Sequence, residues 1–364
     1  MTLRARPRSP FEFAVLLPYR LGYHPRRSVV VVAMHGRTAG VVQRHDVSDD
    51  RDHCEVAAAR ALEVLERDGA DAILLFGFED APWQTSRLLE AISDAATAAG
   101  LSVGVRLVVR DGHGHLTDDD GRTSTQRLPR PADVPAVAPF VRAGVHPLPT
   151  REDHVEQVLP ERDEERAACV AAASGGGRSL AVGADDHRLA HVWSSVLDPA
   201  RDAVLVTEMP DDELRLVVDS LLDVHWRDAL ISVLCPGSLS LAAMPGPVVD
   251  LARRAAARCP WVGDDATPHP ADVPDHEHED VVAVRGRLAQ VAALVPQALT
   301  PSLVTLTGLL SWWEGDGTLA GMCFERALEI DPDHRLSWLL LQLLSHGLRP
   351  WEVALSDGLP GSAA

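Results

Sequence analysis

Hydrophobic and polar residues follow two different periods along the first 145 residues of the chain. The runs Ser28–Met34 and Ala72–Phe78 are continuous and apolar, as is typical of strands buried on both faces. Ala39–Val47 follows a His-Gly-Arg turn, so it is predicted to pair with the first run as an antiparallel hairpin. Arg51–Asp68 has apolar residues at helical spacing and is followed by Gly69, which predicts a helix that ends at this glycine.

The same alternation continues to residue 110. Trp83–Ala99 is predicted to be a second helix and Leu101–Arg110 a further strand. Strands and helices in this order are typical of an α/β layer, so residues 1–145 are expected to form an α/β sheet domain. Asp111–Pro139 is rich in Asp, Gly, Pro and Arg and has no period, which predicts a long loop with at most a short hairpin.

From Arg151 onward the pattern becomes mainly helical, so residues 146–364 are expected to form a second, mainly α-helical domain. Cys259–Asp280 is dense in Pro, Asp and His and is interpreted as an irregular linker. The candidate helices before the last 65 residues are Glu161–Ala173, Asp186–Leu197, Asp211–Trp226, Pro247–Arg258 and Val281–Val295.

The spacing of small and aromatic residues in 300–350 resembles a single tetratricopeptide unit. The residues that carry it are Gly308, Ala320, Phe324, Ala327 and Pro332. Small side chains at Gly308 and Ala320 would let two helices approach closely, with Phe324 between them. The predicted fold class is therefore mixed α/β, with an N-terminal sheet domain and a helical domain that ends in a tetratricopeptide-like hairpin.

The composition excludes several chemistries. All 34 basic residues are Arg, and the chain contains neither Lys nor Asn, which excludes a Schiff-base lysine, a P-loop lysine and a protein-kinase mechanism. A formal net charge of -19 repels polyanions, so nucleic acid is not expected as a partner. No cofactor is predicted.

The spacing of the cysteines and the hydropathy of the chain indicate where in the cell the protein is located. The five cysteines are scattered, and none of them form the short spacing of a zinc knuckle or a redox dithiol. No segment approaches 18 consecutive apolar residues, so no membrane span is expected. We therefore predict a cytoplasmic protein.

Part of this sequence resembles a known family. In LLPYRLGYHPRRSVVVVAM, a Gly-aromatic-His-Pro-x-x-Ser segment precedes a valine-rich strand, and Arg44 and Asp46 follow in VVQRHDV. This opening, the stretch PFVRAGVHPLPTREDHVEQVLP and the ending GDGTLAGMCFERALEIDPDHRLSWLLLQLLSHGLRP resemble an actinobacterial family called domain of unknown function 4192. The resemblance spans most of the chain and implies no established activity.

A candidate ligand site lies just before the first predicted strand. Backbone N–H groups and guanidinium groups there could take a phosphate or a carboxylate. The alternative is local structure, in which a glycine turns the chain, Pro25 stiffens it and the serine hydroxyl bonds the backbone. The residues concerned are Gly22, His24, Arg26, Arg27 and Ser28.

Arg44 and Asp46 extend this candidate site. Strand alternation puts both side chains on one face of the second strand and His45 on the other. They are interpreted either as an ion pair or as acid/base groups beside the His24 segment.

Two histidine- and aspartate-rich segments are candidate metal sites. One is Asp111–Asp120 and the other is His269–Asp280. Neither has the HExxH spacing, and both lie in segments with no predicted rigidity, so no metal site is predicted.

Four tryptophans near the C-terminus, Trp312, Trp313, Trp338 and Trp351, are interpreted as core residues, with a partner-binding surface as the alternative. The leading hypothesis is a protein-interaction or regulatory module whose helical end binds a protein. The competing hypothesis is an enzyme or sensor that binds a small anionic ligand at the N-terminal α/β domain.

Overall fold

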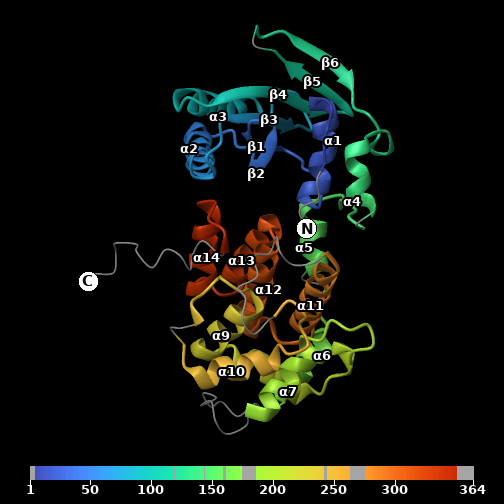
Figure 1. Cartoon of the computed structure of the whole chain (residues 1–364), viewed down its shortest axis with the longest axis vertical. Helices are drawn as coiled ribbons and strands as arrows, with labels where there is room; N and C mark the ends of the chain where they lie inside the picture. Colours follow the sequence, from blue (N-terminus) through green and yellow to red (C-terminus); the bar gives the residue numbers. More distant parts are fainter. Residues whose placement is uncertain are drawn as a thin grey trace, which may run out of the picture. The chain divides into compact units, whose positions relative to one another are not determined.

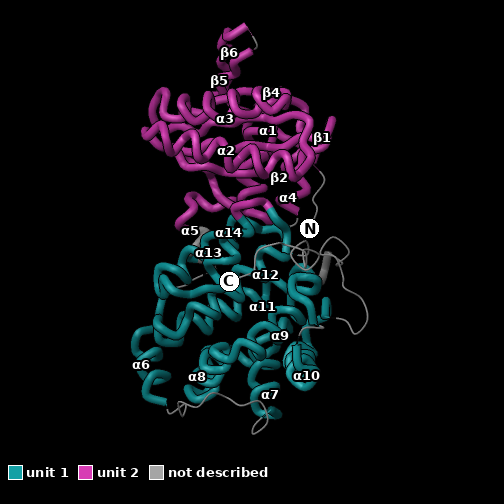
Figure 2. Tube along the Cα trace, turned by 90° about the vertical axis from the view of Figure 1, so that its left-hand side faces the viewer, with its two compact units in different colours: residues 1–2, 155–344, 348–364 teal, residues 3–154, 345–347 magenta. Residues whose placement is uncertain are grey.

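A computed structural model describes residues 5–118, 120–142, 144–158, 161–173, 186–241, 244–262 and 275–350 (Figure 1). The chain divides into two compact units, drawn in different colours in Figure 2. A sheet unit comprises residues 3–154 with 345–347, and a helical unit comprises residues 155–344 with both chain ends. Each has its own hydrophobic core.

The sheet unit is built on one six-stranded sheet in the order β2-β1-β3-β4-β5-β6. β3 and β4 are parallel, and every other neighbouring pair is antiparallel. The strands are β1 (Ser28–His35), β2 (Thr38–Asp46), β3 (Ala72–Phe78), β4 (Ser102–Arg110), β5 (His113–Thr117) and β6 (Thr123–Arg127).

Helices cover both faces of this sheet. The helices α2 (Arg51–Asp68) and α3 (Ser86–Ala98) pack on one face, where Val29, Val31 and Leu75 are fully buried. The helix α1 (Pro10–Leu21) packs on the other face against Val30 and Phe76. The central strands are therefore apolar on both faces, as their continuous runs predict.

Local sequence signals explain where two of these helices begin and end. Ser9 accepts a hydrogen bond from Glu12 at the start of α1, and Gly22 ends that helix in the left-handed conformation. Asp50 caps α2, whose bounds coincide with the predicted helix, and Gly69 ends it with φ of 69°.

The sheet unit contains elements that the sequence did not predict. The helix α1 was not expected, and α4 (Ala138–Arg142) follows two 3₁₀ turns, Pro131–Asp133 and Pro135–Val137. Residues 113–127, expected to be loop or at most a short hairpin, form the strand pair β5–β6, which extends the sheet beyond β4.

Every regular element among the described residues of the second unit is a helix, as expected for this half of the chain. One large core cluster includes Trp193, Trp226 and Trp313, all almost completely buried. Its helices are α5 (Arg151–Val158, which starts in the sheet unit), α6 (Glu164–Ala172), α7 (Asp186–Val196), α8 (Asp211–Ser220), α9 (Val224–Leu234), α10 (Gly246–Ala255), α11 (Asp275–Leu294), α12 (Pro301–Trp313), α13 (Gly317–Ile330) and α14 (Arg335–Ser345), with 3₁₀ turns at Val206–Glu208 and Gln297–Leu299.

Two segments of this unit, one predicted as a helix and one as a linker, differ from their predictions. The single helix expected over Asp211–Trp226 is divided between α8 and α9, because Asp223 caps a new helix through the backbone N–H of Trp226. The expected linker Cys259–Asp280 overlaps the first turns of α11, which begins at Asp275, and its residues 263–274 lie outside the described residues.

The predicted close approach of two helices at Gly308 is present. A Cβ atom at Gly308 in α12 would lie 2.7 Å from Cβ of Cys323 and 2.8 Å from Cε1 of Phe324 in α13. Phe324 and Ala320 are fully buried at this contact. The likeness to a tetratricopeptide unit stays a prediction.

Within the described residues, no helix has both the length and the apolar character needed to cross a lipid bilayer.

Candidate functional site

The candidate site lies at the edge of the sheet where the parallel strands β3 and β4 end. Because β1 is antiparallel to β3, its first residue, Ser28, pairs with Phe78 at the end of β3. Ser28 also pairs with Asp46, the last residue of β2. In α/β sheets, ligands bind preferentially beyond the carboxyl ends of the strands. The predicted site residues therefore occupy a favourable edge.

A cavity of about 400 Å³ lies at this edge, within the sheet unit. Its volume falls in the range of small-molecule sites, about 300–1,000 Å³. The residues that line it are Tyr23, His24, Arg26, Arg27, Arg44, Asp46, Val47, Asp80, Thr150, Arg151 and Glu152.

The segment between α1 and β1 is fixed by backbone hydrogen bonds. His24 donates its N–H to the carbonyl of Leu148 over 2.9 Å, and Leu148 donates to the carbonyl of Gly22 over 2.8 Å. The carbonyl of Arg27 accepts from the N–H of Val47 over 3.1 Å. Arg27 has φ of 43°, in the left-handed region that a side chain with Cβ seldom occupies, so its guanidinium is presented from a strained backbone.

Arg44 and Asp46 lie on the same face of β2, as alternation predicts, and form an ion pair of 2.6 Å. The Arg44 side chain is only 13% exposed, and its guanidinium carbon lies 5.9 Å from the centre of the Tyr23 ring. The Nε atom of Arg44 is buried without a hydrogen-bond partner in the described structure. The pair therefore leaves part of the donor capacity of Arg44 unused.

The remaining charges of the cavity leave one guanidinium without a carboxylate. Arg26 lies 3.4 Å from a carboxylate oxygen of Asp80 in an exposed pair. Arg27 has no ion-pair partner in the described part of the chain. The lining contains four arginines against three carboxylates, so the site has an excess of one positive charge in a chain of net charge -19.

The first turn of α5 closes another side of the cavity. The Thr150 hydroxyl accepts from the N–H of Asp153 over 3.1 Å, and the Asp153 carboxylate accepts from the N–H of Thr150 over 2.9 Å. This reciprocal pair fixes the start of the helix, with Arg151 and Glu152 beside the cavity. The positive end of the helix dipole adds to the local positive potential.

Two histidines near the edge have shifted pKa values. Desolvation by partial burial lowers the pKa of His24. Burial, together with the positive charge of Arg44, lowers the pKa of His45 to about 4, and its Nε2 is buried without a hydrogen-bond partner in the described structure. His45 pairs with Val29 on the α2–α3 side of the sheet, away from the cavity lining.

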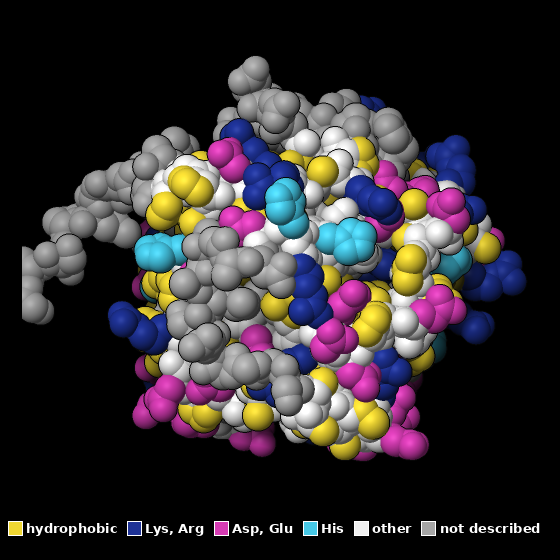
Figure 3. Space-filling model, turned by 90° about the horizontal axis from the view of Figure 1, so that it is seen from below, with side chains coloured by type: hydrophobic (Ala, Val, Ile, Leu, Met, Phe, Trp, Pro, Cys, Tyr) yellow, Lys and Arg dark blue, Asp and Glu magenta, His cyan; other side chains and the backbone are white. Residues whose placement is uncertain are grey.

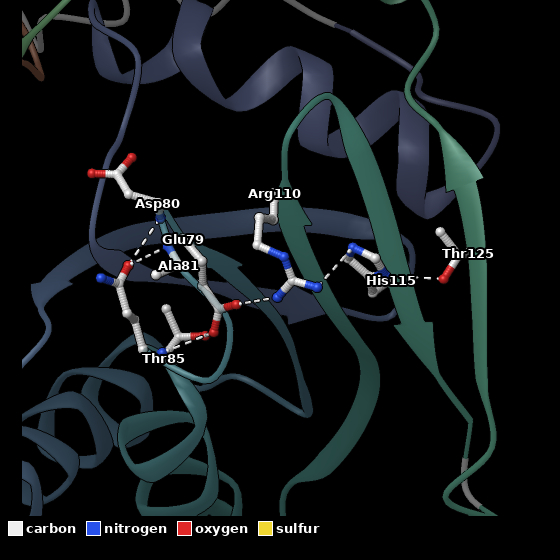
Figure 4. Close-up of polar contacts among 8 residues, drawn as sticks. Glu79, Asp80, Ala81, Thr85, Arg110, His115 and Thr125 are labelled. Atoms are coloured by element: carbon white, nitrogen blue, oxygen red, sulfur yellow. Dashed lines mark hydrogen bonds and ion pairs between the residues drawn. The ribbon is translucent and has the colours of Figure 1, made fainter.

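A buried carboxylate organises the neighbouring loop between β3 and α3. Glu79 Oε1 accepts from the N–H and the hydroxyl of Thr85, over 2.9 and 2.7 Å. Arg110 donates to Glu79 Oε2 over 2.8 Å, and its other terminal nitrogen lies 3.4 Å from Nε2 of His115, whose Nδ1 contacts Thr125 (Figure 4). Since arginine only donates, Nε2 of His115 accepts and Nδ1 carries the proton.

This network fixes the loop that carries Asp80. The Gln84 side chain accepts from the N–H groups of both Asp80 and Ala81. Figure 4 shows the Asp80 carboxylate directed away from Glu79. The buried carboxylate thus has a structural role, and the next residue supplies a charge to the cavity.

Five of the predicted ligand residues line one cavity, and two do not. Gly22 ends α1, and Ser28 is completely buried with no hydrogen-bond partner for its hydroxyl in the described structure. The residues that meet at the cavity are His24, Arg26, Arg27, Arg44 and Asp46.

Two of the four tryptophans, Trp312 and Trp313, are core residues, so the alternative of a partner-binding surface does not apply to them. Trp313 is completely buried and donates to the carbonyl of Pro236, and Trp312 packs edge-on against Phe324 at 6.3 Å. Trp338 is 57% exposed, and Trp351 lies outside the described residues.

Sequence reasoning missed Asp80, Arg151, Glu79 and Arg110. A signal was available for two of them, since Glu79 and Arg110 each stand at the carboxyl end of a strand of the parallel pair. No such signal was available for Arg151. The segment that carries it lies beside the cavity because Leu148, three residues earlier, forms backbone hydrogen bonds with Gly22 and His24, which are distant in the sequence.

The two candidate metal segments do not assemble a ligand set in the described residues. No group of three or more His, Cys, Asp or Glu side chains is placed to hold an ion there. Residues 263–274 of the second segment lie outside the description.

On the face drawn in Figure 3, the described acidic and basic side chains are interspersed.

Comparisons with known proteins place the chain in one family. The sequence model of that family, described as Domain of unknown function (DUF4192), matches residues 10–351. Neither the curated proteins nor the solved structures provided a match.

Proposed function

The chain belongs to the DUF4192 family, and we propose that this member binds a small anionic ligand in the cavity at the sheet edge. The observation that carries the proposal is the convergence of His24, Arg27 and Arg44 on one cavity. These residues come from two segments that meet only in the folded protein.

The chemistry of the lining supports an anion rather than a cation. Arg27 is without an ion-pair partner in the described structure, and the Nε of Arg44 is without a hydrogen-bond partner. Guanidinium groups bind phosphate and carboxylate through paired N–H donors. A bound anion would give Arg27 a charge partner, and it would relieve the repulsion among the arginines.

The proposal favours a ligand-binding protein, such as a sensor or an enzyme, over the interaction module that led the sequence-based hypotheses. A protein partner at the C-terminal helices stays a prediction, and its aromatic anchor within the described residues is Trp338. We also propose a cytoplasmic location, which rests on the scattered, unpaired cysteines.

Ligand-induced thermal stabilisation tests the proposal. A panel of small phosphates and carboxylates at millimolar concentration is expected to raise the melting temperature of the wild-type protein. The Arg27→Ala and Arg26→Ala variants should lose most of this rise, since each removes a guanidinium from the cavity. Arg37→Ala is the matched control, because Arg37 is exposed in the β1–β2 turn at the opposite edge of the sheet. An equal rise in all four proteins would refute the proposal.

A further inference from the structure

The lining of the cavity restricts the class of anion. We infer that the ligand is an anionic polyol, a molecule with one phosphate or carboxylate group and several neighbouring hydroxyl groups. This inference rests on the proposed function, and it adds three observations, on the size of the cavity, on its acidic residues and on the kinds of side chain that line it.

The first observation is size. The cavity measures about 400 Å³. One water molecule takes up about 30 Å³ of liquid, so a single tetrahedral oxyanion of five heavy atoms would leave most of the space to water. A ligand of roughly ten to fifteen heavy atoms matches the volume better, and the rest of that ligand must suit the rest of the lining.

The second observation is that carboxylates are interleaved with the arginines. Asp46 is paired with Arg44, and Asp80 with Arg26. A ligand that presented only negative oxygens would be repelled by these carboxylates. Hydroxyl groups avoid this repulsion, because each can donate a proton to a carboxylate oxygen and accept one from a guanidinium.

The paired state of these carboxylates also disfavours an ammonium group. Asp46 and Asp80 each already face an arginine, so a ligand cation beside them would also lie beside a guanidinium. The excess charge of the lining is positive. A ligand with a net negative charge and neutral hydroxyl groups is therefore a better complement than a zwitterionic amino acid.

The third observation is that most of the lining side chains are charged or polar. Val47 is the aliphatic residue in the lining, and the Tyr23 ring is almost completely buried and faced by the Arg44 guanidinium. Nucleobases are usually held by stacking and by apolar contact. The lining presents one aliphatic side chain and one exposed ring, the imidazole of His24, so it suits a sugar acid or a sugar phosphate better than a nucleotide.

Isothermal titration calorimetry of the full chain tests this inference with six probes. Ribose 5-phosphate and gluconate are the anionic polyols, which distinguish a phosphate from a carboxylate source. Inorganic phosphate, adenosine monophosphate, glutamate and ribitol are the comparisons. At least one anionic polyol is expected to bind ten-fold or more tightly than inorganic phosphate, and more tightly than the other three.

Variants of the protein test separately the contacts made with the hydroxyl groups of the ligand and those made with its anionic group. Asp80→Ala should abolish the ten-fold advantage of the polyol while inorganic phosphate binds equally or better, because Arg26 loses its carboxylate partner. Arg27→Ala should weaken both probes, and Arg37→Ala should change neither. Equal affinities for polyol and phosphate, or tighter binding of adenosine monophosphate or glutamate, would overturn the inference and leave anion binding standing. No binding of any anion would overturn both.

Discussion

At the scale of single residues, backbone strain gathers at the edge of the sheet that carries the cavity. Among the described residues other than glycine, Arg27, Trp83 and Asp111 have positive φ. Asp111 belongs to the Asp-Gly turn between β4 and β5, where such angles are common. Trp83 lies in the turn before α3, whereas Arg27 directly precedes β1 outside any such turn, and strain of this kind costs about 1–3 kcal/mol per residue. The fold tolerates this cost at the sheet edge that carries the cavity, which supports a functional role for that edge.

His45 gives a prediction at the same scale. Its pKa is near 4 in the folded protein and near 6.5 when unfolded, so below pH 6.5 the unfolded chain takes up a proton that the folded chain does not. The stability contributed by neutral His45 is complete above pH 6.5 and is lost as the pH falls toward 4. At pH 5 the loss is about 2 kcal/mol.

Urea unfolding at pH 7 and pH 5 measures this effect. In a His45→Gln variant the decrease in unfolding free energy between the two pH values should be smaller than in the wild type by roughly that amount. His113→Gln serves as the control, because His113 is an exposed residue on β5. An identical decrease in the wild type and in His45→Gln would contradict the prediction.

At the scale of elements, the contact between α12 and α13 depends on a missing side chain. Gly308 lies on a completely buried helix and faces Cys323 and Phe324 within 3 Å of where its Cβ would be. Gly286 in α11 is also helical, but nothing lies within 4 Å of its Cβ position. A side chain at position 308 would therefore collide with packed neighbours, whereas position 286 has room for one.

Substitution by alanine distinguishes the two glycines. Gly308→Ala is expected to lower the free energy of unfolding by about 1–3 kcal/mol, because the added methyl must displace buried neighbours. Gly286→Ala should raise it by about 0.5–1 kcal/mol, because alanine loses less entropy in a helix. Chemical denaturation of both variants checks the signs, and a stabilising Gly308→Ala would show that the helices do not approach as described.

At the scale of the whole molecule, the chain holds two units with separate cores. Units of this size can unfold independently. Gly77 in β3 is the sheet unit's counterpart of Gly308, since a Cβ there would lie 2.5 Å from Oγ1 of the buried Thr85.

Scanning calorimetry of the full chain should therefore resolve two transitions. Gly77→Ala is expected to lower the melting temperature of one, and Gly308→Ala that of the other, by a few degrees each. A single transition that both substitutions lower equally would show that the units unfold together.

The differences between the sequence-based predictions and the structure have physical causes. β6 reads Thr-Ser-Thr-Gln-Arg and is exposed along its whole length, so it lacks the hydrophobic alternation by which a strand is recognised. α1 buries eight of its twelve residues and contains Pro18, so it has neither a polar face nor an uninterrupted helical pattern. Both elements are defined by what they pack or pair with.

The sequence by itself determined the strands β1 and β3, the helix α2 and the helical second half, because burial of apolar side chains imposes periods that can be read along the chain. It also placed Arg44 and Asp46 on one face of a strand. Only the tertiary structure decided that Asp80 and Arg151 join His24 at one cavity, and that Trp312 and Trp313 are buried. Local periodicity fixes which way a side chain points, whereas long-range pairing and packing fix what it meets.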